Sequence, residues 1–463
     1  MSYRRVLTTA VFISLIAFAA SRGRSTHANS TVAAASIEVF ADNPQQPMVS
    51  GFDFSSIDRS VSACQDFNRF ANGGWMDRNP IPAAYSRWGR FETLDEQNVN
   101  VLHGILDGLV AKKRFANANE QKIADFYGSC MDEQTIEAQG IKPLQAELDR
   151  IAKISDLLSL EDEIAVFHAH RIPALFGFGA SQDFKDSSQI IAQLVQAGLG
   201  LPDRDYYTSE DAKMKATRDE YQKHVARTFE LMGHAPDKAA GEAATVMKIE
   251  TKLAEKSSTR VQRRNPDANY HPMTKGMLIE MTPDFDWGRY FRNINLPEVG
   301  KVNVGQPDFF KAADKLLTQT PIDDWKVYLS WHLVNASSNT LSSKFVQESF
   351  DFNGKYLSGT TEILPRWKRC VASTDRSLGE ALGALYVAKT FTAAAKERAR
   401  TMVANLIAAL KEDLTTLSWM SNETRQKAIA KLEAYNRKIG YPDKWRDYEA
   451  LKVARGAYYN NLV

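Results

Sequence analysis

The amino-acid sequence predicts a mainly α-helical protein with a few short strands. Helical periodicity returns over most of the 463 residues, and strand-like apolar runs are confined to residues 171–201. The helical pattern is clearest between residues 403 and 417, where the apolar side chains recur at helical spacing and form one stripe: Val403, Leu406, Ile407, Leu410, Leu414 and Leu417. The sequence contains no internal repeat and no low-complexity tract.

The segment from Cys64 to Glu96 is predicted to be an ordered, non-helical insert. Gly73 and Gly74 give the backbone freedom for a tight bend, whereas Pro80 and Pro82 fix φ and remove two hydrogen-bond donors. The segment interleaves aromatic residues with arginines: Phe67, Phe70, Trp75, Tyr85, Trp88 and Phe91 with Arg69, Arg78, Arg87 and Arg90. This mixture predicts a packed loop that presents guanidinium groups.

The elements after this insert follow from periodicity. Helices are predicted within residues 98–109, 121–133, 141–170, 210–255 and 312–346. Residues 171–201 predict two strands or extended segments of a small sheet, followed by a turn at 201–205. Ser421 is the predicted N-cap of a last helix that Gly440 closes, with its apolar side chains facing inward: Ala428, Ile429, Leu432 and Tyr435.

The N-terminus has the composition of a secretory signal peptide. Arg4 and Arg5 precede the apolar run Val6–Ala20, which is shorter than a typical bilayer span. We therefore expect a signal peptide at 1–22, a flexible lead-in at 23–50 and one folded domain at 51–463; an uncleaved anchor is the alternative. No later stretch is apolar enough to span a membrane. The mature chain is expected to be exported, either to a periplasm or out of the cell.

Charge and composition argue against several partners. The chain carries 58 Lys and Arg against 56 Asp and Glu, a net charge of +2, so composition favours neither nucleic acid nor an anionic membrane surface. The basic run Arg260, Arg263 and Arg264 fits either a clamp for a carboxylate or phosphate or, more simply, a solvated, salt-bridged surface.

The histidines do not predict a metal site. None of the eight is followed by Glu, so H-E-x-x-H does not occur, and H-x-x-E-H is absent as well. His168 and His170 are two residues apart, a spacing that shares a face only in a strand, and their context is helical. G-x-S-x-G and phosphate-loop motifs are also absent, and Gly177-Phe178-Gly179 is better explained as a bend in a strand. Residue by residue, the chain shows no self-sufficient active site.

Three cysteines, Cys64, Cys130 and Cys370, are an odd number for an exported chain. At least one of them must lack a partner within the chain. A buried free thiol is the simplest explanation on composition alone.

The segment CQDFNRFANGGWMDRNPIPAAYSRWGRFETLDE resembles the N-terminal region of the M13 family of zinc metallopeptidases, the neprilysin and endothelin-converting-enzyme family. Further segments resemble the same family in the same order: FYGSCMDEQTIEAQGIKPL (126–144), GLGLPDRDYY (198–207), YLSWHLVNASSNTLSSKFV (328–346), RWKRCV (366–371), LGEALGALYV (378–387) and IGYPDKW (439–445). The resemblance runs from about residue 51 to the C-terminus.

This resemblance implies the large helical N-terminal lobe that caps the catalytic domain of an exported zinc metalloendopeptidase acting on small peptides. The family's substrate strand N-A-Y/F-Y, its H-E-x-x-H motif and its downstream zinc-binding glutamate would all lie beyond Val463. The tripeptide Ala457-Tyr458-Tyr459 echoes the substrate strand, but its position fits the preceding helical segment better. We therefore expect a truncated chain that lacks the catalytic zincin domain, binds no catalytic zinc and is inactive alone. A non-catalytic peptide-binding or scaffold protein, or one half of a split peptidase, is the alternative.

The resemblance also assigns roles to individual residues. Cys130 and Cys370 match the family positions that form a disulfide, and Cys64 matches one whose partner lies near the family's C-terminal end, so Cys64 is expected to be unpaired here. Arg87 matches an arginine that binds the peptide substrate on the primed side; stacking on Trp88 for packing is the alternative. Some family members place a second arginine where this chain has Asp95, which argues against recognition of a terminal carboxylate of that kind.

Overall fold

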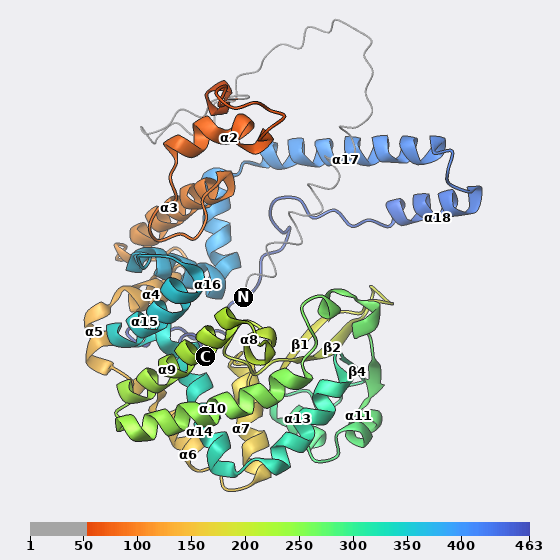
Figure 1. Cartoon of the computed structure of the whole chain (residues 1–463). Helices are drawn as coiled ribbons and strands as arrows, with labels where there is room; N and C mark the ends of the chain where they lie inside the picture. The colour runs from red at the N-terminus through yellow and green to blue at the C-terminus, as the bar shows by residue number, and fades with distance from the viewer. Residues whose placement is uncertain (1–52) are drawn as a thin grey trace, which may run out of the picture. The chain divides into compact units, whose positions relative to one another are not determined.

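The computed structural model describes residues 53–463 (Figure 1). The predicted signal peptide (1–22) and lead-in (23–50) lie outside these residues. The chain divides into two compact units, of which the first ends at Asn79 and the second comprises Pro80–Val463. The described part of the first unit contains the 3₁₀ turn η1 (Phe54–Ser56) and helix α2 (Phe67–Arg78).

Helix α2 corrects the prediction of a non-helical insert. Asp66 caps the helix by accepting a hydrogen bond from the Arg69 N–H at 2.9 Å. The two glycines inside the helix serve a close approach rather than a bend, because a Cβ on Gly74 would lie 2.2 Å from the carbonyl oxygen of Ser55. The prediction holds only for the segment around Pro80 and Pro82, since the next helix already begins at Arg90.

In the second unit, one group of helices surrounds the disulfide. It consists of α3 (Arg90–Val110), α4 (Ala118–Met131), the short α5 (Glu133–Gln139) and α16 (Arg366–Thr390), and α16 packs against both α3 and α4. Asn117 caps α4 by accepting a hydrogen bond from the Glu120 N–H. The group has its own apolar core, which includes Leu106, Ile123, Phe126, Leu378 and Leu382.

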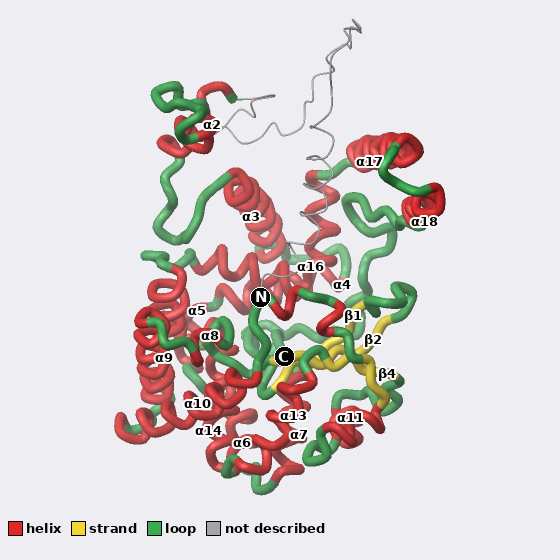
Figure 2. The backbone as a smooth tube through the Cα atoms, turned by 45° about the vertical axis from the view of Figure 1, so that its right-hand side comes forward, coloured by secondary structure: helices red, strands yellow, loops and turns green. Residues whose placement is uncertain are grey.

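A four-stranded sheet lies beside a second group of helices (Figure 2). Its strands are β1 (Phe176–Gln182), β2 (Ile190–Gln196), β3 (Pro272–Thr274) and β4 (Lys301–Val304), in the order β1-β2-β4-β3. Strands β1 and β2 pair antiparallel with Phe178 opposite Leu194, and β2 pairs parallel with β4. The sheet predicted at 171–201 is therefore present, whereas the two strands that complete it were not predicted.

The helices around the sheet bury an aromatic core. Trp287, Tyr290, Phe291 and Trp325 are fully buried there together with Phe176 of β1. The remaining helices of this unit, apart from its last two, are α6 (Gln145–Ala152), α7 (Leu157–Ala169), α8 (Asp205–Thr208), α9 (Ala212–Leu231), α10 (Pro236–Lys256), α11 (Lys275–Met281), α12 (Trp287–Asn293), α13 (Pro307–Gln319), α14 (Ile322–Ser337), α15 (Ser343–Ser349) and the π-helical turn η6 (Phe350–Tyr356). The fold is mainly α with few strands, as predicted.

The last two helices, α17 (Ala393–Thr416) and α18 (Asn422–Glu433), form a hairpin and pack along each other (Figures 1 and 2). Ser421 caps α18 through the Thr424 N–H, as predicted. The prediction that Gly440 closes this helix is wrong, because α18 ends at Glu433 and Gly440 lies in a later turn with φ +73°. Tyr435 is also exposed rather than inward-facing.

Residues near the C-terminus form turns instead of the predicted helical segment. Tyr458 is nevertheless buried, and its hydroxyl donates a hydrogen bond to Ser373 Oγ of α16 at 2.9 Å. Within residues 53–463, none of the helices combines the length and the apolar character that crossing a bilayer requires.

Candidate functional site

The loop that carries Arg87 is fixed to the second unit at several points. Pro80 and Pro82 prevent helix formation at its start. The carbonyl oxygen of Ala83 accepts hydrogen bonds from the backbone N–H groups of Thr361 and Glu362, at 2.9 and 3.3 Å. The loop is therefore anchored to a segment far away in sequence, just before α16.

Arg87 projects its guanidinium into solvent. Its side chain is 85% exposed, and its Nε lies 2.8 Å from Glu92 Oε1. Glu92 is itself only 19% exposed and sits in the first turn of α3, so it holds one edge of the guanidinium in place. Because most of the side chain remains accessible, it can donate further hydrogen bonds to a second acceptor such as a peptide carbonyl.

The neighbouring aromatic residues pack on each other. The rings of Tyr85 and Trp88 meet edge to face with centroids 4.9 Å apart. Arg87 therefore pairs with Glu92, while Trp88 packs on Tyr85. Phe67 and Phe91 are exposed by about two thirds, so the prediction of a packed aromatic segment is wrong for these two residues.

A largely buried ion pair between Glu96 and Lys368 connects the Arg87 loop to α16. Glu96 of α3 accepts hydrogen bonds from the Tyr85 hydroxyl and from the Lys368 ammonium. Burial, reinforced by the hydrogen bond to Glu96, raises the pKa of Tyr85, so the phenol stays protonated and keeps donating. Lys368 also lies over the Trp367 ring, 5.4 Å from its centroid.

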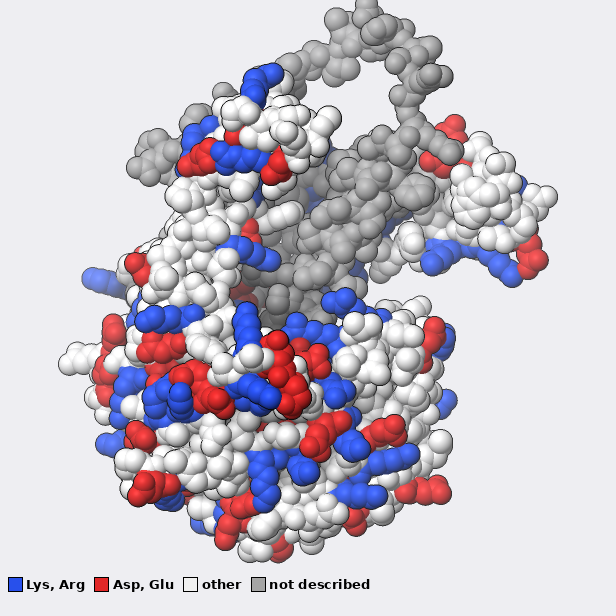
Figure 3. Space-filling view, in the orientation of Figure 1, with Lys and Arg blue, Asp and Glu red and all other residues white. Residues whose placement is uncertain are grey.

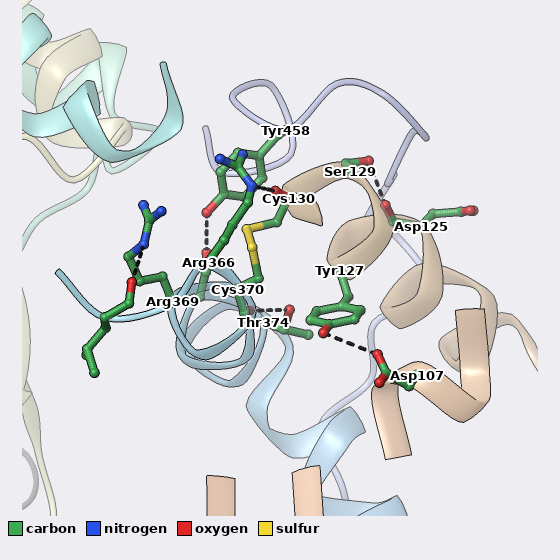
Figure 4. The surroundings of a disulfide bond; sticks show 12 residues. Asp107, Asp125, Tyr127, Ser129, Cys130, Arg366, Arg369, Cys370, Thr374 and Tyr458 are labelled. Atoms are coloured by element: carbon green, nitrogen blue, oxygen red, sulfur yellow. Dashed lines mark hydrogen bonds between the residues drawn. A yellow bond between two sulfur atoms is a disulfide. The ribbon is translucent and has the colours of Figure 1, made fainter. Parts of the chain in front are cut away.

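The disulfide fixes the helix that provides Lys368. Cys130 of α4 is bonded to Cys370 of α16, with the two Cα atoms 5.7 Å apart and both residues buried. Figure 4 shows Arg366, one turn earlier on α16, reaching back to α4, where its Nε donates a hydrogen bond to the Cys130 carbonyl at 2.8 Å. The disulfide thus ties α4 to α16 two residues from the ion pair that holds the Arg87 loop.

Two other residues singled out in the sequence lie in exposed positions. Asp95 lies on the exposed surface of α3, where it adds negative charge on the helix that follows the Arg87 loop. Cys64 is exposed and forms no disulfide with any residue of the described range.

The segment GLGLPDRDYY builds a buried polar cluster. Glu250 of α10 is completely buried and accepts hydrogen bonds from the hydroxyls of Tyr207 and Tyr221, at 2.7 and 2.8 Å, and from the Gly200 N–H at 3.1 Å. His332 Nε2 lies 3.0 Å from the same carboxylate. Glu250 was missed in the sequence because it sits in an ordinary charged helical pattern, and its partners come from three distant segments.

The histidines that the structure describes do not form a metal centre. His168 is held by Tyr290 and by the Ala174 carbonyl, at 2.7 and 3.0 Å, and burial lowers its pKa to about 4. In the part of the chain that the structure describes, no three His, Cys, Asp or Glu side chains come together as metal ligands. The residues present therefore do not fit a catalytic zinc ion.

The basic run lies at an exposed turn, and one of its arginines is paired. Arg260 forms an ion pair with Asp203. On the face of the second unit seen in Figure 3, Lys and Arg are interspersed with Asp and Glu. This mixed surface agrees with the near-neutral net charge.

The chain is thus a mainly helical lobe in which a disulfide fixes the helix beside the arginine loop. Residues 63–442 match the model of peptidase family M13, N-terminal region. The chain belongs to peptidase family M13, as the sequence resemblance predicted.

Named relatives agree with this assignment. The chain is 31% identical over 411 residues to endothelin-converting enzyme 1 of Bos taurus, covering 86% of this chain and 54% of the relative, and 30% identical to neprilysin-3 of Drosophila melanogaster, covering 88% and 55%. The crystal structure of the Mycobacterium tuberculosis zinc metalloprotease Zmp1 in complex with an inhibitor superposes with a TM-score of 0.84 at 32% identity, covering 89% of this chain and 63% of that one. The chain thus spans about half the length of the curated relatives it matches.

Proposed function

We propose that the chain is the substrate-facing N-terminal lobe of an exported M13-type zinc metalloendopeptidase, and that Arg87 contacts the peptide substrate on the primed side of the scissile bond. The observation that carries the proposal is the placement of Arg87. Its guanidinium is 85% exposed, while its loop is fixed by backbone hydrogen bonds and by the Glu96–Lys368 pair. A fixed loop with an exposed cationic donor is suited to bind a peptide, because the loop needs no further ordering on binding.

The chemistry of the contact favours a peptide carbonyl over a terminal carboxylate. Glu92 already neutralises one edge of the guanidinium, and Asp95 adds a second negative charge on α3. A neutral carbonyl accepts a hydrogen bond from Arg87 without repulsion from these acids, whereas a free C-terminus would be repelled.

We assign peptide hydrolysis to zinc ligands of the H-E-x-x-H type, a motif that does not occur in these 463 residues. Zinc in such an enzyme polarises the scissile carbonyl and activates water. The names of the relatives, zinc metalloprotease and endothelin-converting enzyme among them, support a zinc-dependent peptidase activity for the complete assembly. We propose residues 1–22 as the signal peptide, 23–50 as a lead-in and 51–463 as the lobe, acting in a periplasm or outside the cell.

The proposal is tested by the binding of a labelled decapeptide with an amidated C-terminus to residues 23–463, followed by fluorescence anisotropy. Arg87→Ala should weaken binding about tenfold or more, since one hydrogen bond to a charged group contributes about 1.5–3 kcal/mol. Arg263→Ala, which removes an exposed arginine of the basic run, is the matched control and should bind as the wild type does. Equal binding by wild type and Arg87→Ala, or no binding by wild type, would contradict the proposal.

A further inference from the structure

A polar pocket lies in the second unit, where the C-terminal turns meet α6 and the end of α7. It has a volume of about 790 Å³, within the range of about 300–1,000 Å³ that is usual for small-ligand sites. Its walls come from the last residue of α5, the turn η2 (Lys142–Leu144), α6, His170 and residues within 456–463. None of the described residues that line it belongs to the Arg87 loop.

The C-terminal wall of the pocket is fixed to the rest of the unit. Tyr459 is buried in the aromatic core around the sheet, whereas Tyr458 is buried in the core of the helices around the disulfide. The Gly456 N–H donates a hydrogen bond to Ser129 Oγ of α4 at 2.9 Å. Both groups of helices therefore hold this wall, and a ligand would bind to it with little further ordering of the chain.

Glu147 of α6 presents an unpaired carboxylate oxygen to the pocket. The residue is 8% exposed and lines the cavity. Its Oε2 is buried and accepts no hydrogen bond from any residue of 53–463. Arg150, one turn later on α6, donates instead to Glu163, through Nε and Nη2 at 3.1 and 3.3 Å. Because an unpaired buried carboxylate oxygen is unfavourable, a donor is expected in the cavity beside it.

Lys142 brings a positive charge to the same pocket. It is exposed, and its ammonium group has no ion pair or hydrogen bond within the described range. Burial, together with the charge of Arg150, lowers the pKa of His170, so its imidazole is neutral at pH 7 and can either donate or accept. Since Arg150 and Glu163 neutralise each other, the side chains that line the pocket leave one negative and one positive charge unpaired.

We propose that this pocket, defined by Gln139, Lys142, Glu147, Arg150, His170 and Tyr459, binds a small zwitterion, either a free α-amino acid or a dipeptide. The ammonium group of the ligand donates to Glu147 Oε2, and its carboxylate accepts from the Lys142 ammonium. Both hydrogen bonds are charge-assisted, which makes them stronger than bonds between neutral groups. The inference does not depend on the peptide contact proposed for Arg87.

The test is isothermal titration calorimetry of the full mature chain with the dipeptide alanyl-alanine and, separately, with free alanine. We expect saturable one-to-one binding of at least one of these two probes. The N-acetylated form of the bound probe lacks the ammonium group, and its amide lacks the carboxylate. Each of these capped forms should bind at least tenfold more weakly, because each loses one charge-assisted hydrogen bond.

Two substitutions on α6 locate the binding. Glu147→Gln keeps the shape of the side chain but removes its charge, so it should weaken binding at least tenfold. Asp149→Asn makes the same kind of change at an exposed residue of the same helix that does not line the pocket, and it should bind as the wild type does. Arg87→Ala should also bind the zwitterion normally, so this inference and the proposed function can fail separately.

Melting temperatures show whether the variants fold. Should Glu147→Gln fail to fold, Lys142→Gln at an exposed position carries the same expectation of at least tenfold weaker binding. Binding of only alanine or only the dipeptide supports the site and identifies its ligand. Three results would each overturn the inference: no binding of either probe, which leaves the pocket to water, equal binding of the capped forms, or wild-type affinity in the folded pocket variant.

Discussion

Gly200 lies where no side chain fits, beside the buried carboxylate of Glu250. A Cβ at this position would be 1.9 Å from the Tyr221 hydroxyl oxygen, which itself donates to Glu250. The close approach lets the Gly200 N–H reach the carboxylate, so the glycine is needed for the hydrogen bonds of the cluster rather than for a turn.

Gly200→Ala should therefore lower the free energy of unfolding by about 2–3 kcal/mol or more, because the methyl group must displace Tyr221 from a fully buried polar network. Gly241→Ala is the matched control: it lies within α10 with nothing within 4 Å of the added Cβ. The control should gain about 0.5–1 kcal/mol from helix propensity. Urea denaturation of the two variants measures both effects, and similar midpoints for the two would contradict this account of Gly200.

Glu161 of α7 is a second buried acid, with a different pH dependence. It is 1% exposed and accepts a hydrogen bond from the Asp286 N–H at 3.2 Å. Burial raises its pKa to about 7, with the nearby Asp286 and Asp162 acting in the same direction. The folded state therefore holds this proton at pH values where the unfolded chain has already released it.

The folded protein should consequently lose stability as the pH rises from about 4.5 to about 7, by about 3 kcal/mol at most from this group. Glu161→Gln removes the titration, so its stability relative to wild type should rise across the same window. Urea midpoints at pH 5, 6, 7 and 8 measure the difference. Glu280→Gln, at an exposed glutamate of α11, should run parallel to wild type; a constant difference between Glu161→Gln and wild type at all four pH values would rule the assignment out.

Among the elements, α16 connects the disulfide to the Arg87 loop. The bond between Cys130 and Cys370 closes a loop between residues 240 apart, so the loop-entropy model predicts a stabilisation of about 5 kcal/mol. The same helix carries Lys368, whose pairing with Glu96 fixes the loop. The stability of the fold and the position of Arg87 therefore both depend on α16.

Cys130→Ala combined with Cys370→Ala should lower the free energy of unfolding by up to about 5 kcal/mol, since the unfolded chain regains the freedom of the long loop. Cys64→Ala, at an exposed cysteine, is the control and should change stability by no more than about 0.5 kcal/mol. Denaturant unfolding under non-reducing conditions gives both values. A loss below about 1 kcal/mol in the double variant would show that the disulfide contributes little.

The helices and strands could be predicted from the sequence only where their pattern is local. Helical spacing located most helices and the paired strands β1 and β2, because these patterns reflect local burial. The error at α2 arose because Gly73 and Gly74 were taken as bend formers. Gly74 instead admits the backbone of Ser55, and Gly73 the side chain of Asp58, contacts that local sequence does not reveal. Strand β4 was missed because its parallel pairing with β2 joins segments about a hundred residues apart.

The site was predictable only in part, and for a similar reason. Arg87 and the two paired cysteines came from resemblance to a family, since no local pattern distinguishes them from other arginines and cysteines. The partners that fix the Arg87 loop, Glu96 and Lys368, lie 272 residues apart. The apolar stripe of α17 was recognised correctly as a helix face, and α18 packs along this helix.

At the scale of the whole molecule, the chain combines an M13 fold with an absence of metal-ligand clusters among its described residues. The anchored loop with its exposed arginine is the observation on which the proposed peptide contact rests. The account therefore predicts binding without hydrolysis for these 463 residues.

The most direct test is the hydrolysis of a fluorogenic peptide by purified residues 23–463 supplied with zinc. The account predicts no cleavage above the blank, with or without a chelator, because H-E-x-x-H is missing from the sequence. Peptide cleavage that a chelator abolishes and zinc restores would contradict it.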